Sequence, residues 1–400
     1  MRILFIAGGS TATIFALSPL AMSARNAGHE VFMASTEDMM PVVAASGLPA
    51  VPVTNLTIKH FITTDRSGNP VEFPANPVGE MFFTGRWFGR MAAASLDALL
   101  ALAGNWHPDL VVGGTMSYAA PILAAHLGVP FVRHAWDISD PTIMDQGANE
   151  ELRPELAQAG LDELPEPDMW IDICPPSLRR QDAPVAQMMR WIPGNRQRQL
   201  EPWMYTRPER GRVCVTSGTR VSHERNFEFL CNLAETVSAL DAEVVIAAQE
   251  DIAADLREEL GDVRAGWLPL DVVAPTCDLI VHHAGGVTAL TAMNAGVPQL
   301  LFPSDDAKAV VPSQRIADFG AAITLLRGED SPDGIRKACQ ELLSNPSYGA
   351  RARALADEIT TLPTSAEVVG VLERAHRPQP SGRPQPSDRP RNEHTIEEKP

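Results

Sequence analysis

The sequence has few cysteines, an excess of acidic residues and no long apolar run. Its five cysteines, spread over 400 residues, include no Cys-x-x-Cys pair. This argues against a disulfide framework and a zinc site, and it fits a reducing cytoplasm. A net charge of −17 argues against nucleic acid as a partner, because such binding needs a basic face. No segment has about 18 uninterrupted apolar residues, so neither a membrane-spanning helix nor a membrane partner is expected.

The N-terminal stretch predicts a βαβ unit. Residues 3–7 are an apolar run, too short for a signal peptide, that predicts a first strand. A Gly-Gly-Ser-Thr turn at residues 8–11, a helix to about Ala27 and a strand over residues 30–34 follow. This order is typical of a doubly wound parallel sheet. A dinucleotide fingerprint does not fit, because GGSTAT lacks the third glycine of G-x-G-x-x-G.

The same pattern restarts in the second half of the chain. A strand over residues 212–215, a turn at residues 216–219 and a strand over residues 243–248 predict a second α/β domain. The length of the chain is sufficient for two such domains. We expect domains at residues 1–200 and 212–362, joined by a polar linker at residues 201–211, then a last helix over residues 363–376. The Pro-rich segment 377–400 is expected to be disordered, because it buries too little apolar surface.

One stretch of the second half predicts an anion site. Residues 279–283 read as a buried strand, residues 284–286 as a tight turn, and residues 287–295 as a helix that Gly296 ends. A strand, a glycine turn and a helix start direct unpaired backbone N–H groups at an anion, and the helix dipole adds to the attraction. His283 supplies a further donor at the turn. The alternative is an ordinary connection between strand and helix.

This stretch resembles the donor-site signature of GT-B glycosyltransferases, which use nucleotide sugars. The matching letters are HHAGGVT at residues 282–288 and AGVPQ at residues 295–299, with Ala284 and Val287 where glycines are usual. The segment GWLP at residues 266–269 is similar to the one that places an aromatic ring beside the nucleobase. The resemblance implies a fold of two Rossmann-like domains that face each other across a cleft. It implies donor contacts by Ser217, Gly218, Thr219, Trp267, Leu268, His283, Gly285, Gly286, Val287 and Thr288.

The catalytic base is not found at its usual place. Members of this family often carry a histidine in the first turn, and Thr13 stands at the matching position here. The apolar segment 128–137 predicts a strand with Asp137 at its carboxyl end, where ligands bind in open α/β sheets. From position alone, Asp137 fits a general base, a helix N-cap or a loop carboxylate.

Further segments resemble the aromatic-polyketide branch of the family, which acts in angucycline pathways. They include HFITTDR at residues 60–66, FTGRWF at residues 83–88 and EPWMYTR at residues 201–207. The resemblance implies that Asp137 is the base and that Ser10 lies near the reacting centre. It also implies an inverting transfer that needs no metal and no cofactor. A dTDP-activated deoxysugar, D-olivose, is the expected donor, and an aromatic polyketide of the angucycline type is the expected acceptor.

The type of bond stays open. We expect a C-glycoside, because most of the similar branch members make one; an O-glycoside on a phenolic hydroxyl is the alternative. A nucleotide-sugar epimerase would bind the nucleotide at the same turn, yet it needs no apolar acceptor region. A non-catalytic helper would be expected to have lost the donor signature. A homodimer is a further hypothesis.

Aromatic residues gather between residues 51 and 90 around a segment rich in Gly, Asn and Pro. Long loops in compact domains are often functional, so this region predicts a lid over a flat apolar acceptor. The alternative is a helix that packs the same aromatics into the core. Together with the first turn and the strand before Asp137, this region supplies the expected acceptor contacts: Thr13, Ile58, Phe61, Phe82, Trp87 and Trp136.

Overall fold

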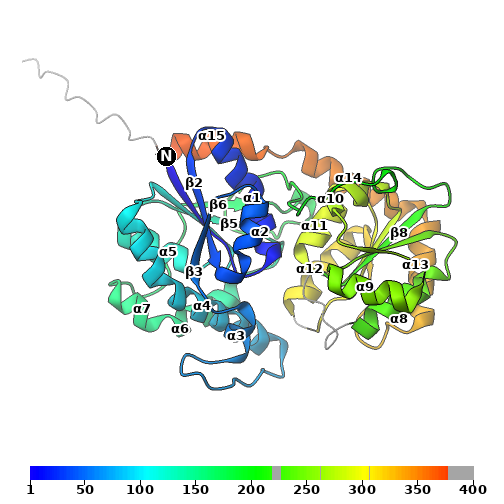
Figure 1. Ribbon diagram of the computed structural model, residues 1–400, viewed down its shortest axis with the longest axis horizontal. Coiled ribbons are helices and arrows are strands. Elements are labelled where there is room, and N and C mark those ends of the chain that lie inside the picture. Colours follow the sequence, from blue (N-terminus) through cyan, green and yellow to red (C-terminus); the bar gives the residue numbers. More distant parts are fainter. Residues whose placement is uncertain (219–226, 262, 306, 377–400) are drawn as a thin grey trace, which may run out of the picture.

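The computed structural model describes residues 1–376 except 219–226, 262 and 306. It contains two α/β units side by side, each built on its own sheet, and the last helix returns to the first unit (Figure 1). None of the helices described is both long and apolar enough to cross a membrane.

The first sheet has seven strands in the order β3-β2-β1-β4-β5-β6-β7. All of its pairings are parallel, with Ile3 of β1 beside Val31 on one side and Leu110 on the other. Its central strands β1 and β4 are buried over nearly their whole length, because helices cover both faces of a parallel sheet. The strands are β1 (Arg2–Ile6), β2 (Glu30–Thr36), β3 (Ala50–Thr54), β4 (Leu110–Gly114), β5 (Phe131–His134), β6 (Met169–Asp172) and β7 (Gln187–Met188).

The second sheet has six parallel strands in the order β10-β9-β8-β11-β12-β13. Its central strand β8 lies between β9 and β11, as β1 lies between β2 and β4 in the first sheet. The strand order reverses beside β8 and beside β1, and ligands bind at such points in open α/β sheets. The strands are β8 (Arg212–Thr216), β9 (Glu243–Ala247), β10 (Arg264–Gly266), β11 (Leu279–His282), β12 (Gln299–Leu301) and β13 (Ala322–Thr324).

Helices cover both sheets (Figure 1). Those of the first unit are α1 (Thr11–Asn26), α2 (Met40–Ala45), α3 (Ile58–Thr63), α4 (Pro77–Asn105), α5 (Ala119–Leu127), α6 (Thr142–Glu151) and α7 (Arg153–Gln158). Those of the second are α8 (Phe227–Ser238), α9 (Glu250–Leu260), α10 (Leu270–Val273), α11 (Gly286–Asn294), α12 (Ala307–Phe319), α13 (Pro332–Ser344) and α14 (Pro346–Thr361). The last helix, α15 (Ser365–His376), packs on the first unit. Short 3-10 turns are η1 (Glu37–Met39), η2 (Pro176–Leu178), η3 (Pro202–Met204) and η4 (Ala274–Thr276).

The predicted lid is wrong over most of its length. Residues 77–90 belong to the 29-residue helix α4, and residues 58–63 form α3. Asn76 starts α4 as its N-cap and accepts a hydrogen bond from the Gly79 amide at 2.8 Å, with Pro77 at the first helical position. The helix turns Trp87 into the core, as the alternative interpretation of this region proposed.

Helices α4 and α6 approach each other so closely that only glycine fits at their contact. A Cβ added to Gly85 would lie 1.8 Å from the Met144 carbonyl oxygen, and one added to Gly147 would lie 2.0 Å from the Phe82 carbonyl oxygen. Backbone therefore packs against backbone between the two helices, which leaves α6 no freedom to slide along α4.

The last helix, α15, lies against α1 of the first unit. Ser365 hydrogen bonds with Ser23 at 2.7 Å, and Glu373 pairs with His29 at 3.0 Å. The apolar side of α15, which includes Leu372, is buried in the same core as β1. The predicted disordered tail, residues 377–400, lies outside the described residues.

The segment before β8 packs with the second unit. Gln197 donates to Asp271 at 2.8 Å, Arg207 pairs with Asp278 at 2.8 Å, and Met204 is fully buried among residues of the second unit. The predicted linker at residues 201–211 therefore belongs in space to the second unit, and the chain leaves the first unit before residue 197.

Candidate active site

The first turn of the chain is held by Thr13. Its hydroxyl donates to the carbonyls of Gly8 and of Ser10, the latter at 2.8 Å, and the Ser10 hydroxyl lies 3.4 Å from the Thr13 oxygen. Thr13 is buried and committed to the turn. The residue at the usual position of the catalytic histidine thus shapes the backbone around Ser10, which is the extended N-cap of α1.

Asp137 lies in a loop three residues beyond the end of β5, which stops at His134 and not at Asp137 as expected. The carboxylate is half-buried and accepts two hydrogen bonds from Ser139, one from the amide at 2.9 Å and one from the hydroxyl at 2.5 Å. Asp137 starts no helix in this loop, because α6 begins only at Thr142. Of its three predicted roles, the N-cap is therefore wrong.

The start of this loop is anchored by Arg133 and Thr115. The Arg133 guanidinium donates to the Thr115 carbonyl at 2.7 Å and pairs with Asp145 at 2.6 Å. The Thr115 hydroxyl accepts from the Trp136 amide at 3.2 Å. Burial removes the guanidinium from water, yet the paired Asp145 raises the pKa of Arg133, so the anchor stays charged.

Asp137 meets the second unit at Gly286. A Cβ added to this glycine would lie 2.3 Å from the Asp137 Cβ, so only glycine leaves room for the aspartate. Gly286 is the first residue of α11, and Gly285 is its extended N-cap. The candidate base therefore lies against the helix start that the sequence predicts as an anion site.

The predicted anion site consists of two neighbouring turns, after β8 and after β11, with the His283 ring between them. The His283 ring would be 2.3 Å from a Cβ on Gly218 and 2.6 Å from a Cβ on Gly285, so it fills the space between the turns after β8 and β11. Strand β11 and helix α11 follow the prediction to within one residue at each end. Val287 and Thr288, in the first turn of α11, are half-buried.

The turn after β8 brings Ser217 and Gly218 beside this site. Ser217 is buried, and the Gly218 amide donates to the Thr216 hydroxyl at 3.1 Å. Gly218 has a φ of +75°, which a side chain would strain. Thr219, the third predicted contact of this turn, lies outside the described residues.

A cavity of about 850 Å³ lies between the two units. It is lined by Thr11 and Phe15 of α1 and by Trp267 and Leu268 of the second unit. The Trp267 indole donates to the Arg196 carbonyl at 2.9 Å and makes an edge contact with Phe15, with ring centroids 6.4 Å apart. The tryptophan is thus held in place with its ring at the cavity wall.

The predicted acceptor residues fall into two groups. Ile58 and Phe82 are half-buried, whereas Phe61, Trp87 and Trp136 are almost fully covered. The covered rings form a buried aromatic layer of the first unit, here called the aromatic floor, and they present little surface to a ligand.

Phe88, which sequence reasoning did not single out, joins this floor. It stacks on Trp87 at 3.7 Å between ring centroids and lies 5.7 Å from Trp136. A Cβ on Gly8 would touch both Phe88 and Trp136. Spacing along α4 was the only signal that could have found it.

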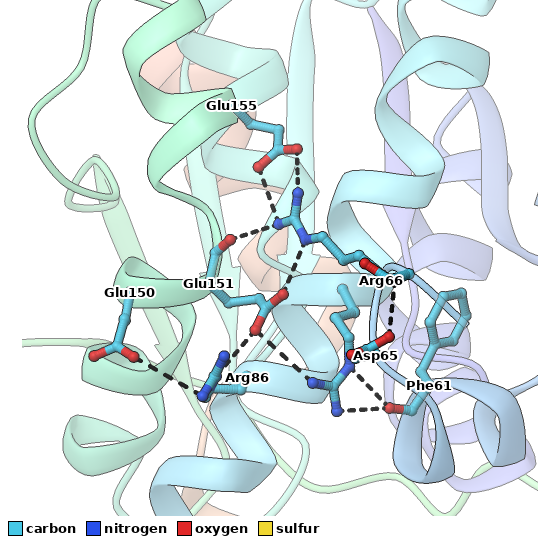
Figure 2. Close-up of polar contacts among 9 residues, drawn as sticks. Phe61, Asp65, Arg66, Arg86, Glu150, Glu151 and Glu155 are labelled. Carbon is cyan, nitrogen blue, oxygen red and sulfur yellow. Dashed lines mark hydrogen bonds and ion pairs between the residues drawn. The ribbon is translucent and has the colours of Figure 1, made fainter. Parts of the chain in front are cut away.

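A cluster of arginines and glutamates connects the helices of the first unit that carry the predicted acceptor residues, here called the acceptor side (Figure 2). Glu151 accepts from Arg66 at 2.9 Å and from Arg86 at 3.0 Å, and Arg66 also reaches Glu155 at 2.6 Å. Arg90 donates both to the Phe61 carbonyl and towards Glu151. The cluster ties α3 and the loop that carries Arg66 to α4, α6 and α7.

Metal ligands are not gathered at this site. Across the residues that the structure describes, no three His, Cys, Asp or Glu side chains lie close enough to hold a metal ion. The expectation that neither a metal nor a cofactor takes part stays a prediction.

Two sequence profiles match the chain over most of its length. The N-terminal domain of the Erythromycin biosynthesis protein CIII-like family matches residues 22–218, and the C-terminal domain of the same family matches residues 231–375. The chain belongs to this EryCIII-like family of glycosyltransferases.

Relatives agree with this assignment. L-demethylnoviosyl transferase of Streptomyces niveus is 34% identical, covering 94% of this chain and 99% of the relative. Elloramycin glycosyltransferase ElmGT of Streptomyces olivaceus is 30% identical, covering 94% and 97%. The glycosyltransferase SsfS6 of Streptomyces sp. SF2575, solved with thymidine diphosphate, is 35% identical with a TM-score of 0.84, covering 94% of this chain and 99% of that one.

These matches confirm the predicted GT-B fold of this EryCIII-like glycosyltransferase. The narrower assignment to the angucycline branch is not confirmed, because none of these matches is named for an angucycline pathway. The family thus shows the type of enzyme, and the choice of sugar and acceptor stays a prediction.

Proposed function

We propose that the protein transfers a deoxysugar from a dTDP-sugar to a polyketide aglycone. The observation that carries the proposal is the contact between Asp137 and Gly286, which sets a candidate base against the start of α11. A sugar whose diphosphate lies at that helix start has its anomeric carbon beside the carboxylate. Membership in the family and the thymidine diphosphate bound to SsfS6 support the choice of donor.

The donor is held by the second unit. Its nucleobase lies by Trp267 and Leu268 in the cavity between the units, and its diphosphate lies on the turns of Ser217, Gly218 and Thr219 and of His283 to Thr288. Backbone N–H groups at the start of α11 stabilise the charge that grows on the leaving diphosphate. With this charge stabilised by the chain itself, the step needs no metal and no cofactor.

The acceptor is activated by the first unit. Asp137 takes the proton of a phenolic hydroxyl, and the phenolate attacks the anomeric carbon from the side opposite the diphosphate. The bond from that carbon to the diphosphate oxygen breaks, dTDP leaves, and the configuration inverts. Ser10 lies in the turn nearest this step, and the half-buried Ile58 and Phe82 flank the aglycone, whereas the buried Thr13 and Trp136 support this region from behind.

The finer choice is a D-olivosyl C-glycoside of an angucycline-type aromatic polyketide. A phenolate carries negative charge on oxygen and on the ortho carbon, so deprotonation by one base serves either bond. After attack through carbon, the ortho carbon loses its proton to solvent and the oxygen regains one, which restores the phenol. The orientation of the ring decides which atom attacks, and shifts on the order of 1 Å are decisive for such steps. The product of dTDP-olivose and a small angucyclinone distinguishes the bonds, because a C-glycoside survives acid and an O-glycoside reverts to the aglycone.

Exchanging the base tests the proposal directly. We expect Asp137→Asn to lower kcat about 100-fold or more, because general base catalysis typically contributes 10²- to 10⁴-fold. The affinity for dTDP, measured by calorimetry, should stay within about 2-fold, because the carboxylate forms no bond with the donor. Asp140→Asn is the control in the same loop, since within the described part of the chain Asp140 bonds Arg180 and Thr142 and not Asp137. Turnover of Asp137→Asn at the wild-type rate would remove the base assignment.

Two other functions make different predictions in the same assay. A nucleotide-sugar epimerase would convert the dTDP-sugar without any acceptor and leave the aglycone unchanged. A non-catalytic helper would leave both unchanged. The intact turn around His283 favours the transferase over the helper, and the half-buried Ile58 and Phe82, which a bound aglycone can reach, favour it over the epimerase.

A further inference from the structure

Arg315 crosses from the second unit to the loop that carries Asp137. It belongs to α12, which lies with α11 on the side of the second unit that faces the first (Figure 1). One guanidinium nitrogen donates to the Leu178 carbonyl at 2.7 Å, and the other donates to the Ile138 carbonyl. Both carbonyls belong to the first unit, so a single side chain joins α12 to two of its segments.

The Ile138 carbonyl is half of a peptide group whose other half binds the candidate base. The N–H of that same peptide, on Ser139, donates to the Asp137 carboxylate at 2.9 Å. A chain of two hydrogen bonds therefore connects the Arg315 guanidinium, through the peptide group between Ile138 and Ser139, to the Asp137 carboxylate. A cation on the carbonyl polarises the peptide and strengthens the bond that its N–H makes, as in any chain of hydrogen bonds.

The position of Arg315 is not explained by stability alone. Its third donor, Nε, is buried without a hydrogen-bond partner among the residues that the structure describes. A buried donor left unsatisfied costs free energy, so a residue kept only for packing would be better replaced by an apolar one.

We propose that Arg315 is a positioning residue that couples closure of the two units to the placement of Asp137. When the units part, the guanidinium leaves the Ile138 carbonyl and the loop loses its outer support. When the units close on the donor, Arg315 holds the peptide group between Ile138 and Ser139 in place, and Gly286 restricts the space around Asp137. These two contacts together set the orientation of the Asp137 carboxylate. This inference rests on the proposed role of Asp137 as base.

The test separates turnover from binding. We expect Arg315→Ala to lower kcat about 30-fold, because losing charge-assisted bonds that position a reacting group costs one to two orders of magnitude. The Kd for dTDP, measured by calorimetry, and the KM for the dTDP-sugar should change less than about 3-fold, because the hydrogen bonds of Arg315 within the described residues go to Leu178 and Ile138 and not to a donor-binding turn. Arg315→Lys should recover part of the loss, since an ammonium can reach one of the two carbonyls.

The matched control crosses the same interface without touching the Asp137 loop. Glu358 of α14 accepts from Ser177, the neighbour of Leu178, at 3.0 Å from its amide. Glu358→Ala therefore removes a bond between the units and should keep kcat within about 3-fold of wild type, because the Asp137 loop keeps its support. Thermal unfolding of each variant shows whether it is folded. If Arg315→Ala folds poorly, the kcat of Arg315→Lys, which keeps the positive charge, is compared with wild type instead.

Three outcomes would overturn the inference. They are wild-type kcat in Arg315→Ala, an equal fall of kcat in Glu358→Ala, and a loss in Arg315→Ala that lies in the Kd for dTDP. Measured beside them, Asp137→Asn tells the two proposals apart. If Asp137→Asn is inactive while Arg315→Ala turns over normally, only the positioning role fails. If Asp137→Asn turns over normally, the base assignment fails and the positioning role falls with it.

Discussion

Ala284 holds the proposed donor-site turn in a backbone conformation that suits glycine. Its φ is +59°, and it is the only non-glycine residue with a positive φ in the part of the chain that the structure describes. The resemblance to GT-B transferases marks this position as one where glycine is usual. The strain is thus stored directly before Gly285 and Gly286, at the proposed diphosphate site.

Replacing this alanine should stabilise the protein. Ala284→Gly removes a left-handed strain of about 1–2 kcal/mol, partly offset by the greater freedom of glycine in the unfolded chain, so we expect a net gain of about 0.5–1 kcal/mol. Denaturant unfolding measures it. Ala295→Gly, at the other end of α11 with a φ of −78°, relieves no strain and should lose stability. A loss in Ala284→Gly as well would show that the turn is unstrained.

The contact of α4 with α6 decides the shape of the acceptor side at the scale of whole elements. Gly85 and Gly147 allow the two backbones to touch, and the cluster around Glu151 ties α3 and α7 to the same pair (Figure 2). The region predicted as a lid is therefore a packed layer of helices. Its rigid elements, and not a long loop, hold Ile58 and Phe82 at the acceptor side.

Two glycines on α4 provide a matched test of this contact. Gly85→Ala places a Cβ 1.8 Å from a backbone oxygen, so α6 must move, and we expect a loss of about 2–4 kcal/mol in the free energy of unfolding. Gly104→Ala, near the end of the same helix, meets nothing within 4 Å and should gain about 0.5–1 kcal/mol from helix propensity. Equal effects of the two substitutions in urea unfolding would contradict the tight contact.

At the scale of the whole molecule, each of the two sheets contains one strand near the candidate site whose last residue is a fully buried histidine. His134 ends β5, and burial lowers its pKa to about 4. His282 ends β11 and contacts Gln299 at 2.8 Å, and burial with the neighbouring His283 lowers its pKa to about 3. Both rings are neutral in the folded protein at pH 7 and stay neutral well below the pKa of an exposed histidine.

These two histidines predict acid sensitivity of both units. Below about pH 6.5 the unfolded chain takes up protons at both rings while the folded protein does not, so the free energy of unfolding falls as the pH falls towards 4, by about 1.4 kcal/mol per pH unit and histidine. Denaturant unfolding at several pH values measures this slope. His134→Gln should flatten it, whereas His126→Gln, an exposed control, should leave it unchanged. An equal slope in all three proteins would contradict the prediction.

Local patterns were enough to predict several strands and turns of this protein. The apolar runs at residues 3–7 and 279–283 became β1 and β11, and the helix after the second run was predicted to within one residue. Such runs are informative because a strand of a parallel sheet is buried on both faces and tolerates little else. The motif letters at residues 282–288 further identified the class of enzyme, since the backbone path of an anion site restricts which residues fit.

Contacts between distant residues required the folded chain. That Phe88 joins Trp136, that Asp137 rests on Gly286 and that Arg315 reaches the Ile138 carbonyl follow from packing of segments more than 40 residues apart. No local pattern encodes such pairs, because each residue has the same neighbours in sequence whichever distant surface it meets. Apolar runs and glycine turns therefore indicate where a site lies, and the packing of the two units decides which side chains meet there.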